Sequence, residues 1–156
     1  MPDPALVACT FLAATGSGLI GGVFCAFSTF VMKALGRLPP AEGMAAMQAI
    51  NVAVINPIFL GVFMGTALFA VVPLMWWERP GAAWVAAGSA LYVVGTLLAT
   101  MVFNVPLNNA LAAIMPTDPG AERLWATYQK RWTMWNHVRT AASLAAMGAF
   151  IMALRQ

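Results

Sequence analysis

The sequence predicts an all-α fold: a four-helix transmembrane bundle with an interfacial amphipathic helix before the last span. Two observations lead to this prediction, the composition and four long apolar runs. Of the 156 residues, 62% are apolar and only 8% are charged, whereas ordinary soluble domains carry about 25% charged residues. A chain this short buries only roughly 60–70% of its unfolded surface, so the remaining apolar surface requires lipid. The composition excludes a soluble monomer, a disordered chain and a nucleic-acid binder.

The four apolar runs predict the spanning helices of a single integral membrane domain, residues 1–156. They cover about 5–32, 50–77, 82–103 and 137–154. Each comes close to or exceeds the roughly 20 residues that a spanning helix needs. Lipid offers no partner to free backbone groups, which restricts spanning segments to helices or closed barrels. The runs are continuous and do not alternate with polar residues, which favours helices. The start of the chain lacks the basic region of a signal peptide, so we expect the first run to be retained.

Basic residues near the ends of the runs predict the orientation of the bundle. The connections 33–49 and 104–136 hold five of them: Lys33, Arg37, Arg123, Lys130 and Arg131. The opposite side holds Arg79 and Arg155. Basic residues accumulate on the cytoplasmic side of membranes. We therefore expect a multi-pass protein of the cell membrane, with both connections in the cytoplasm and both termini outside.

Two pairs of glycines four residues apart allow close approach between helices. They are Gly18 with Gly22 and Gly61 with Gly65. The spacing fits packing inside the bundle. It also fits the seam of a homo-oligomer or of a complex with a membrane partner subunit.

Polar side chains gather at one end of the predicted spans, where each is costly unless it has a partner or a function. Asn51 and Asn56 begin the second run, Asn104 and Asn108 follow the third, and Asn136 precedes the fourth. If the two polar connections share a membrane face, these amides converge into one pocket. Amides donate and accept hydrogen bonds, so they suit a neutral ligand with hydroxyl or carbonyl groups. The alternative is that they cap helix ends and bond to each other.

An aromatic stripe leads into the last run. Trp125, Tyr128, Trp132 and Trp135 recur at intervals of three, four and three residues, which places them on one face of a helix. Tryptophan and tyrosine are enriched at membrane interfaces, so the stripe fits an interfacial helix. It also fits a stack of rings that lines the entry for a flat aromatic substrate. In the preceding connection, Pro106 is expected to kink or end the third helix.

Arg139 and His137 are the two candidate catalytic residues. Arg139 lies about one turn inside the last run, and no acidic residue lies within any run. Its guanidinium needs acceptors, which the interface, the amides or an anionic group of a ligand can supply. His137 points to nearly the opposite side of the helix. It fits a hydrogen-bonded interfacial side chain, a proton-transfer group or an axial haem ligand. One histidine and two distant cysteines predict no metal site of several protein ligands.

Several short segments, in order along nearly the whole chain, carry a resemblance to a known family. They are Phe27-Ser28-x-Phe30-Val31-Met32, Ala46-Met47-Gln48-x-Ile50-Asn51, Asn56-Pro57-x-Phe59, Gly65-Thr66, Asn104-Val105-Pro106-Leu107-Asn108, Trp125-x-x-Tyr128 and Trp132-x-x-Trp135-Asn136-His137-x-Arg139. With them, the chain resembles the small integral membrane proteins of the anthrone oxygenase-like family, DUF1772.

The resemblance implies a four-helix membrane protein and, from the fungal relatives, the oxidation of polycyclic anthrones to anthraquinones without an established organic cofactor. It carries functional roles over to a set of polar and aromatic residues: Asn104, Asn108, Trp135, Asn136, His137 and Arg139. In such a cofactor-independent oxygenase, His137 would remove a proton from the anthrone. Arg139 or an amide would stabilise the resulting oxyanion.

Two other functions remain open on the sequence alone. The first is a non-enzymatic small membrane subunit or a lipid- or quinone-binding module. The second is a haem-binding membrane protein that uses His137. For all three functions the lipid bilayer is an expected partner. The oxygenase and the binding module would also bind an apolar, flat aromatic or quinone-like small molecule.

Overall fold

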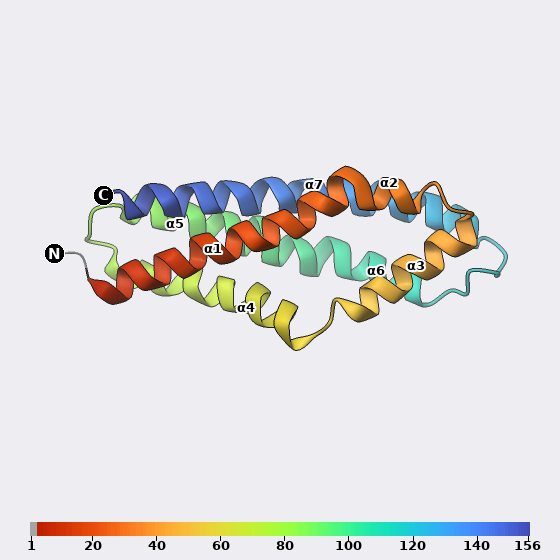
Figure 1. Cartoon of the computed structure of the whole chain (residues 1–156), viewed down its shortest axis with the longest axis horizontal. Coiled ribbons are helices and arrows are strands. Elements are labelled where there is room, and N and C mark those ends of the chain that lie inside the picture. Colours follow the sequence, from red (N-terminus) through yellow and green to blue (C-terminus); the bar gives the residue numbers. More distant parts are fainter. Residues whose placement is uncertain (1–2) are drawn as a thin grey trace.

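The structure, a computed structural model, describes residues 3–156 and is helical, with no strand, over that range. Four long rods lie side by side, and Asp3 lies at the same end as the C-terminus (Figure 1). Each rod is long and apolar enough to cross a membrane. The rods are Pro4–Leu35, Pro57–Trp76, Ala82–Ala112 and Ala121–Leu154. The all-α fold with four spans is therefore confirmed.

The first rod is one continuous helix with a widened turn near its end. It consists of α1 (Pro4–Ala26), the π-helical η1 (Phe27–Val31) and α2 (Met32–Leu35). The carboxylate of Asp3 caps its start by accepting a hydrogen bond of 2.8 Å from the backbone N–H of Ala5. The rod ends at Leu35, slightly beyond the expected residue 32, and Lys33 on its last turn is exposed.

The second rod begins later than expected. Residues 50–53 are the end of a separate helix, α3 (Pro40–Ala53), and the span itself is α4 (Pro57–Val71) with the 3-10 turn η2 (Val72–Trp76). The break has a local cause: a residue before proline avoids the helical conformation, and Asn56 is extended, with φ −126° and ψ 158°. Figure 1 shows the chain turning sharply between α3 and α4.

The third rod continues well past the expected end at residue 103. It consists of α5 (Ala82–Ala90), two π-helical stretches, η3 (Leu91–Leu98) and η4 (Thr100–Asn104), and α6 (Val105–Ala112). Of the two effects expected of Pro106, a kink or an end of the helix, the structure contradicts the second, because the helix continues through it. It lies in the first turn of α6, directly after the widened turns, and a proline is tolerated in a first turn because that N–H has no helical partner.

The fourth rod, α7 (Ala121–Leu154), is a single helix of 34 residues. At 1.5 Å per residue it is about 51 Å long, whereas the hydrocarbon core of a bilayer is about 30 Å thick. The segment expected to form an interfacial helix is therefore the first part of α7, and it continues directly into the span. No proline interrupts it, and its only glycine is Gly148 near its end.

The core is divided into two clusters along the rods. The first packs α1, α4, η3 and α7 around Phe24, Phe63, Tyr92 and Phe150. The second lies towards the opposite end, where α3 and α6 pack on the start of α7. It contains Met44, Met47, Leu111, Trp125, Tyr128 and Trp132. Three of the four rings of the aromatic stripe of α7 are thus part of the interior of the bundle, and Trp135 is only half-buried.

The outer surface of the rods is apolar. Only 28–39% of the residues in the most apolar window of each rod are buried inside the protein. Large side chains such as Ile58 and Met75 are 81% and 77% exposed. A soluble protein rarely exposes apolar patches of such extent, so the chain is a multi-pass membrane protein with these side chains in lipid.

The two glycine pairs have different surroundings. A Cβ added at Gly18 would lie 2.7 Å from the sulfur of Met147 on α7, so this glycine serves packing inside the bundle. A Cβ added at Gly61 or Gly65 would have no neighbour within 4 Å. Gly22 of the first pair has the same open space as Gly61 and Gly65, so within residues 3–156 only Gly18 of the four makes a close contact of this kind.

Candidate functional site

The central polar contacts of the bundle are made by Asn136 and Arg139, three residues apart on the inner face of α7. The amide nitrogen of Asn136 donates to the backbone carbonyl of Phe24 and to the hydroxyl of Ser28, both at 2.7 Å. Its amide oxygen accepts a hydrogen bond of 2.7 Å from one terminal nitrogen of Arg139. The other terminal nitrogen of Arg139 donates to the hydroxyl of Thr100 at 3.2 Å. These bonds join the first, third and fourth rods.

Arg139 is a buried cation without a negative partner. Its side chain is only 4% exposed. The guanidinium carbon lies 4.1 Å from the ring centre of Phe24 and 5.1 Å from that of Trp132, and aromatic faces attract cations. Its hydrogen bonds go to neutral oxygens, and its Nε is buried with no partner. Buried charges are ordinarily paired, so this guanidinium keeps unused capacity to bind an anion.

A second group of polar contacts lies further from the C-terminal end of α7. The amide oxygen of Asn108 accepts two hydrogen bonds of 2.9 Å, one from the hydroxyl of Tyr128 and one from the indole N–H of Trp132. The amide of Asn51 donates to the same tyrosine oxygen at 3.4 Å. These contacts connect α3 and α6 to the aromatic stripe.

Asn104 lies between the two groups. Its amide nitrogen donates to the backbone carbonyl of Trp132 at 3.2 Å, while its amide oxygen is buried without a partner. The site thus contains one unused donor, the Nε of Arg139, and one unused acceptor, the oxygen of Asn104. A ligand that combines an anionic oxygen with a hydroxyl offers a partner for each.

Three of the expected site residues lie outside this network. Asn56 caps α4: its oxygen accepts from the N–H of Phe59 at 2.9 Å, and its nitrogen donates to the carbonyl of Ala53. Trp135 is half-buried and stacks on Phe103, with ring centres 3.5 Å apart. His137 is exposed on α7, as its two-residue distance from Arg139 predicts. The structure thus joins Asn51, Asn104 and Asn108 to the α7 residues and separates His137 from Arg139.

Two hydroxyl residues and one ring of the network were not among the site residues predicted from the sequence. They are Ser28, Thr100 and Phe24. A signal for Thr100 existed, because it lies one helical turn before Asn104 on the same face. Hydroxyl residues within spans are ordinary, however, since they bond to their own helix, as Thr100 also does to the carbonyl of Thr96.

The depth of the site follows from the length of α7. Asn136 lies about 27 Å from Leu154, at 1.5 Å per residue. If Leu154 marks one edge of the hydrocarbon core, Asn136 lies close to the other edge, because the core is about 30 Å thick. The clustering of the amides at one membrane face stays a prediction, for which this depth is the expected position.

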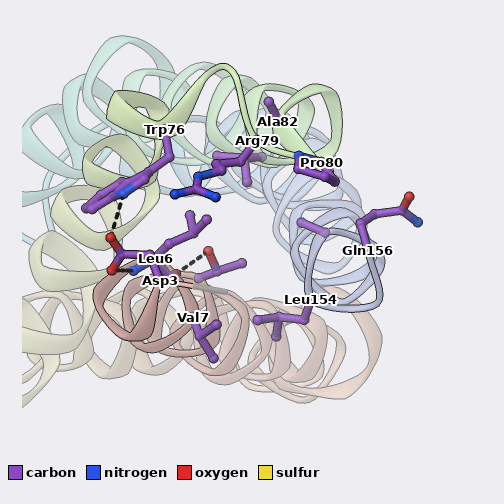
Figure 2. A pocket seen from close by; sticks show the side chains of 12 residues that line it. Asp3, Leu6, Val7, Trp76, Arg79, Pro80, Ala82, Leu154 and Gln156 are labelled. Carbon is purple, nitrogen blue, oxygen red and sulfur yellow. Dashed lines mark hydrogen bonds between the residues drawn. The ribbon is translucent and has the colours of Figure 1, made fainter. Parts of the chain in front are cut away.

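A separate pocket lies at the opposite end of the bundle, beside the C-terminus (Figure 2). Its volume is about 320 Å³, and Leu6, Arg79 and Leu154 are among its lining residues. The carboxylate of Asp3 accepts a hydrogen bond of 3.0 Å from the indole of Trp76. The N–H of Ala5, the indole and the backbone of Leu6 hold the pKa of Asp3 below its usual value, so the carboxylate remains charged down to acidic pH.

Within residues 3–156, no group of three or more histidine, cysteine or acidic side chains is arranged to hold a metal ion. The polar groups of the site are therefore amides, hydroxyls and one guanidinium, and aromatic rings surround them.

Fold and site together define a class: a small helical membrane protein with a buried, unpaired cation among amides and aromatic rings. A model of the anthrone oxygenase family matches residues 44–149, about two thirds of the chain. The chain therefore belongs to the anthrone oxygenase family, DUF1772. The match includes Asn51, Asn104, Asn108 and the network residues of α7, but not α1. No curated protein and no solved structure matches the chain.

Proposed function

We propose that the protein binds a flat, phenolic polycyclic ligand of the anthrone type as its anion beside Arg139 and oxidises it with molecular oxygen. The single observation that carries the proposal is the buried guanidinium with no carboxylate partner and an unused Nε. An oxyanion on an aromatic ring is a partner of the right charge, and it would be stabilised in a low-dielectric site by a fixed cation. Membership of the anthrone oxygenase family supports the choice of ligand.

The surroundings of Arg139 suit a flat aromatic ligand. The rings of Phe24 and Trp132 lie against the guanidinium, and Trp132 continues into stacked contacts with Tyr128 and Trp125. Aromatic faces bind other aromatic faces with offset or tilted geometry. The unused oxygen of Asn104 would accept from a phenolic hydroxyl. Entry requires the side chains around Arg139 to move apart, and a lipid-soluble ligand would arrive from the bilayer.

The proposed reaction balances with oxygen as the only co-substrate. Loss of one proton from the methylene carbon gives an anion whose charge is shared with the ring oxygen beside Arg139. The anion gives two electrons to O₂ and forms a carbon–oxygen bond, which becomes a hydroperoxide on protonation. Loss of the second methylene hydrogen as a proton and cleavage of the O–O bond then give the ketone of the anthraquinone and one water. The role of Arg139 is to stabilise the anion, which makes the first proton loss easier.

His137 is the candidate base, because it is the only imidazole in the chain. Its side chain lies on the exposed side of α7, so a proton would reach it from a ligand beside Arg139 only through intervening water. A His137→Ala variant tests this role separately. If that variant retains full turnover of an anthrone, His137 is not the base, and the anion would then form by proton loss to water.

The test measures oxygen uptake and quinone absorbance with emodin anthrone, above the spontaneous rate in air. We expect Arg139→Gln to lose about a hundredfold of the catalysed rate, the order typical of one oxyanion-stabilising group. Arg139→Lys keeps the charge but not the planar fork, so partial activity is expected. Arg131→Gln is the matched control, since Arg131 is an exposed arginine of the same helix. Unchanged turnover in Arg139→Gln would overturn the proposed role of Arg139.

A non-enzymatic aromatic-binding module uses the same site without the reaction. Titration of emodin anthrone under nitrogen, followed by quenching of tryptophan fluorescence, separates the two functions. Saturable, Arg139-dependent binding with no oxygen uptake above the spontaneous rate in air would support the module and exclude the oxygenase. The absence of both binding and turnover would exclude both.

A further inference from the structure

A second hollow lies on the outside of the bundle, between the end of the first rod and α7. Its volume is about 680 Å³, and it is shallow and open to the surface. One wall is the segment from Met32 to Arg37 on α2 and the turn that follows it. The other wall is the face of α7 from Ala126 to His137. The walls pack closely, because a Cβ added at Gly36 would lie 2.7 Å from the amide nitrogen of Gln129.

The hollow is strongly basic. Lys33, Arg37 and Lys130 line it, and all three are exposed. The neutral side chains of Gln129, Thr133 and His137 add hydrogen-bonding groups, and no carboxylate lies among the lining residues from either wall. On α7, Lys130, Thr133 and His137 follow at intervals of three and four residues and so share one face of the helix. On the other wall, Lys33 lies on the last turn of α2 and Arg37 in the turn that follows it.

The hollow lies where the first and fourth rods reach the edge of the membrane. Lys33 is the first charged residue after the 28 apolar or uncharged residues that begin at Ala5. His137 lies about 26 Å from Leu154 along α7, close to the thickness of the hydrocarbon core. The lining also contains Met32 and Met134, and Met134 is 50% exposed. The site thus combines cations at headgroup depth with apolar side chains beside them.

We propose that this hollow binds the phosphate of an anionic phospholipid of the surrounding bilayer. Arginine and lysine side chains bind phosphate oxygens by charge-assisted hydrogen bonds, and basic pockets beside spanning helices attract anionic headgroups. The acyl chains of the lipid extend along the exposed apolar surface that begins at Met134. The hollow shares no residue with the network around Arg139, although His137, the candidate base of the proposed reaction, is among its lining residues. Its binding of lipid does not depend on the oxidation of any ligand.

The test uses the purified full-length protein in a neutral detergent and native mass spectrometry. Phosphatidylglycerol, phosphatidylcholine and inorganic phosphate are added separately, and the fraction of protein that retains each is measured. We expect retention of phosphatidylglycerol at concentrations at which phosphatidylcholine is lost, because only the former has a net negative charge. Equal retention of both lipids would overturn the proposal. Retention of inorganic phosphate as strong as that of phosphatidylglycerol would assign the hollow to free phosphate instead and would equally overturn it.

The variants locate the site. Lys33→Gln, Arg37→Gln and Lys130→Gln should each weaken the binding of phosphatidylglycerol about fivefold, the effect of one basic group near a membrane surface. Arg123→Gln with Arg131→Gln is the matched control: it removes two exposed charges from the same helix, and neither side chain lines the hollow. Equal losses in the control and in the hollow variants would show that binding follows net charge alone. Lys33→Arg with Lys130→Arg preserves both charges and should retain the lipid, which guards against a loss caused by misfolding.

Discussion

At the scale of single residues, Arg139 has the most unusual environment in the chain. Its charge is neutralised by no acid, because the five acidic residues, Asp3, Glu42, Glu78, Asp118 and Glu122, all lie outside the four apolar runs. It is held by two neutral oxygens and two ring faces. The protein thus maintains a positive charge at a depth where an ion is expensive, which is consistent with a role in binding an anion.

A counter-ion placed beside Arg139 should compete with such an anion. Thr100→Asp puts a carboxylate where the hydroxyl now accepts a hydrogen bond of 3.2 Å from Arg139. Thr100→Asn has nearly the same shape but no charge, so the pair isolates the effect of charge. We expect Thr100→Asp to bind emodin anthrone under nitrogen at least about tenfold more weakly than Thr100→Asn, since a close pair of opposite charges is worth several kcal/mol near a protein surface. Equal affinities of the two variants would contradict an anion site at Arg139.

Asn108 is predicted to stabilise the fold through its two acceptor bonds. Asn108→Ala leaves the hydroxyl of Tyr128 and the indole N–H of Trp132 without their shared acceptor. Side-chain hydrogen bonds in membrane proteins contribute about 0.6 kcal/mol on average and up to about 1.7, so a loss of roughly 1–3 kcal/mol is expected. Thermal unfolding in detergent measures it. Asn109→Ala is the control, because the neighbouring amide is exposed; an equal effect in both would show that local helix propensity is responsible.

Most of the inner network could be predicted from residue type. Amides and an arginine next to apolar runs are costly in lipid, and the structure places Asn51, Asn104, Asn108, Asn136 and Arg139 in one connected region. Residue type does not, however, predict the direction in which each side chain points from its helix. His137 and Asn56 carry the same polar signal, yet one faces outward and the other caps a helix.

At the scale of helices, the number of spans was predictable and their ends were not. Hydrophobicity sets the apolar middle of each span, but it does not mark where a helix leaves the membrane. The third rod continues beyond the expected end at residue 103 to Ala112. The second run, predicted from residue 50, includes the last four residues of α3, which Asn56 and Pro57 separate from the span. Pro106 shows the remaining difficulty, because a proline that follows widened turns does not break the helix.

The close contact between the third and fourth rods depends on glycine. A Cβ added at Gly95 would lie 2.5 Å from the Cβ of Ala142, which is too close for two carbon atoms. Gly95→Ala should push the rods apart and lower stability by about 1–3 kcal/mol, the usual cost of overpacking. Gly148→Ala has open space and should be neutral or raise stability by up to about 1 kcal/mol through helix propensity. Unfolding of both variants in detergent checks the contrast, and equal effects would contradict the packing of these rods.

At the scale of the whole molecule, the bundle is longer than a bilayer is thick. A spanning segment needs about 20 residues, whereas three of the four rods have more than 30. The second core cluster packs around the additional length, at the first half of α7. The connections 33–49 and 104–136 belong to this extended end, and five of the eight basic residues lie there. We therefore expect this end to project into the cytoplasm, as the distribution of basic residues predicts.

Cysteine labelling in intact cells tests that orientation. In a background with Cys9→Ala and Cys25→Ala, single cysteines are introduced by Glu78→Cys, Gln156→Cys and Thr127→Cys, all at exposed positions. A membrane-impermeant maleimide should label the first two from outside and the third only after the cells are permeabilised. The opposite pattern would place the termini in the cytoplasm, and the anionic-lipid hollow would then belong to the outer leaflet.

Because the core is divided into two clusters, the two halves of the protein are stabilised by different interactions, one half in lipid and the other in water. Between the acyl chains, burial of an apolar side chain gains little, because lipid is as apolar as the interior; close packing and polar contacts hold that half together. Around α3 and the start of α7, which we expect to project from the membrane into water, packing expels water and the ordinary hydrophobic effect applies. Urea should therefore loosen the projecting half first, whereas harsh detergents should attack the membrane half. The polar network of Asn136 and Arg139 lies at the boundary between the two halves. Its hydrogen bonds should therefore be disrupted when either half unfolds.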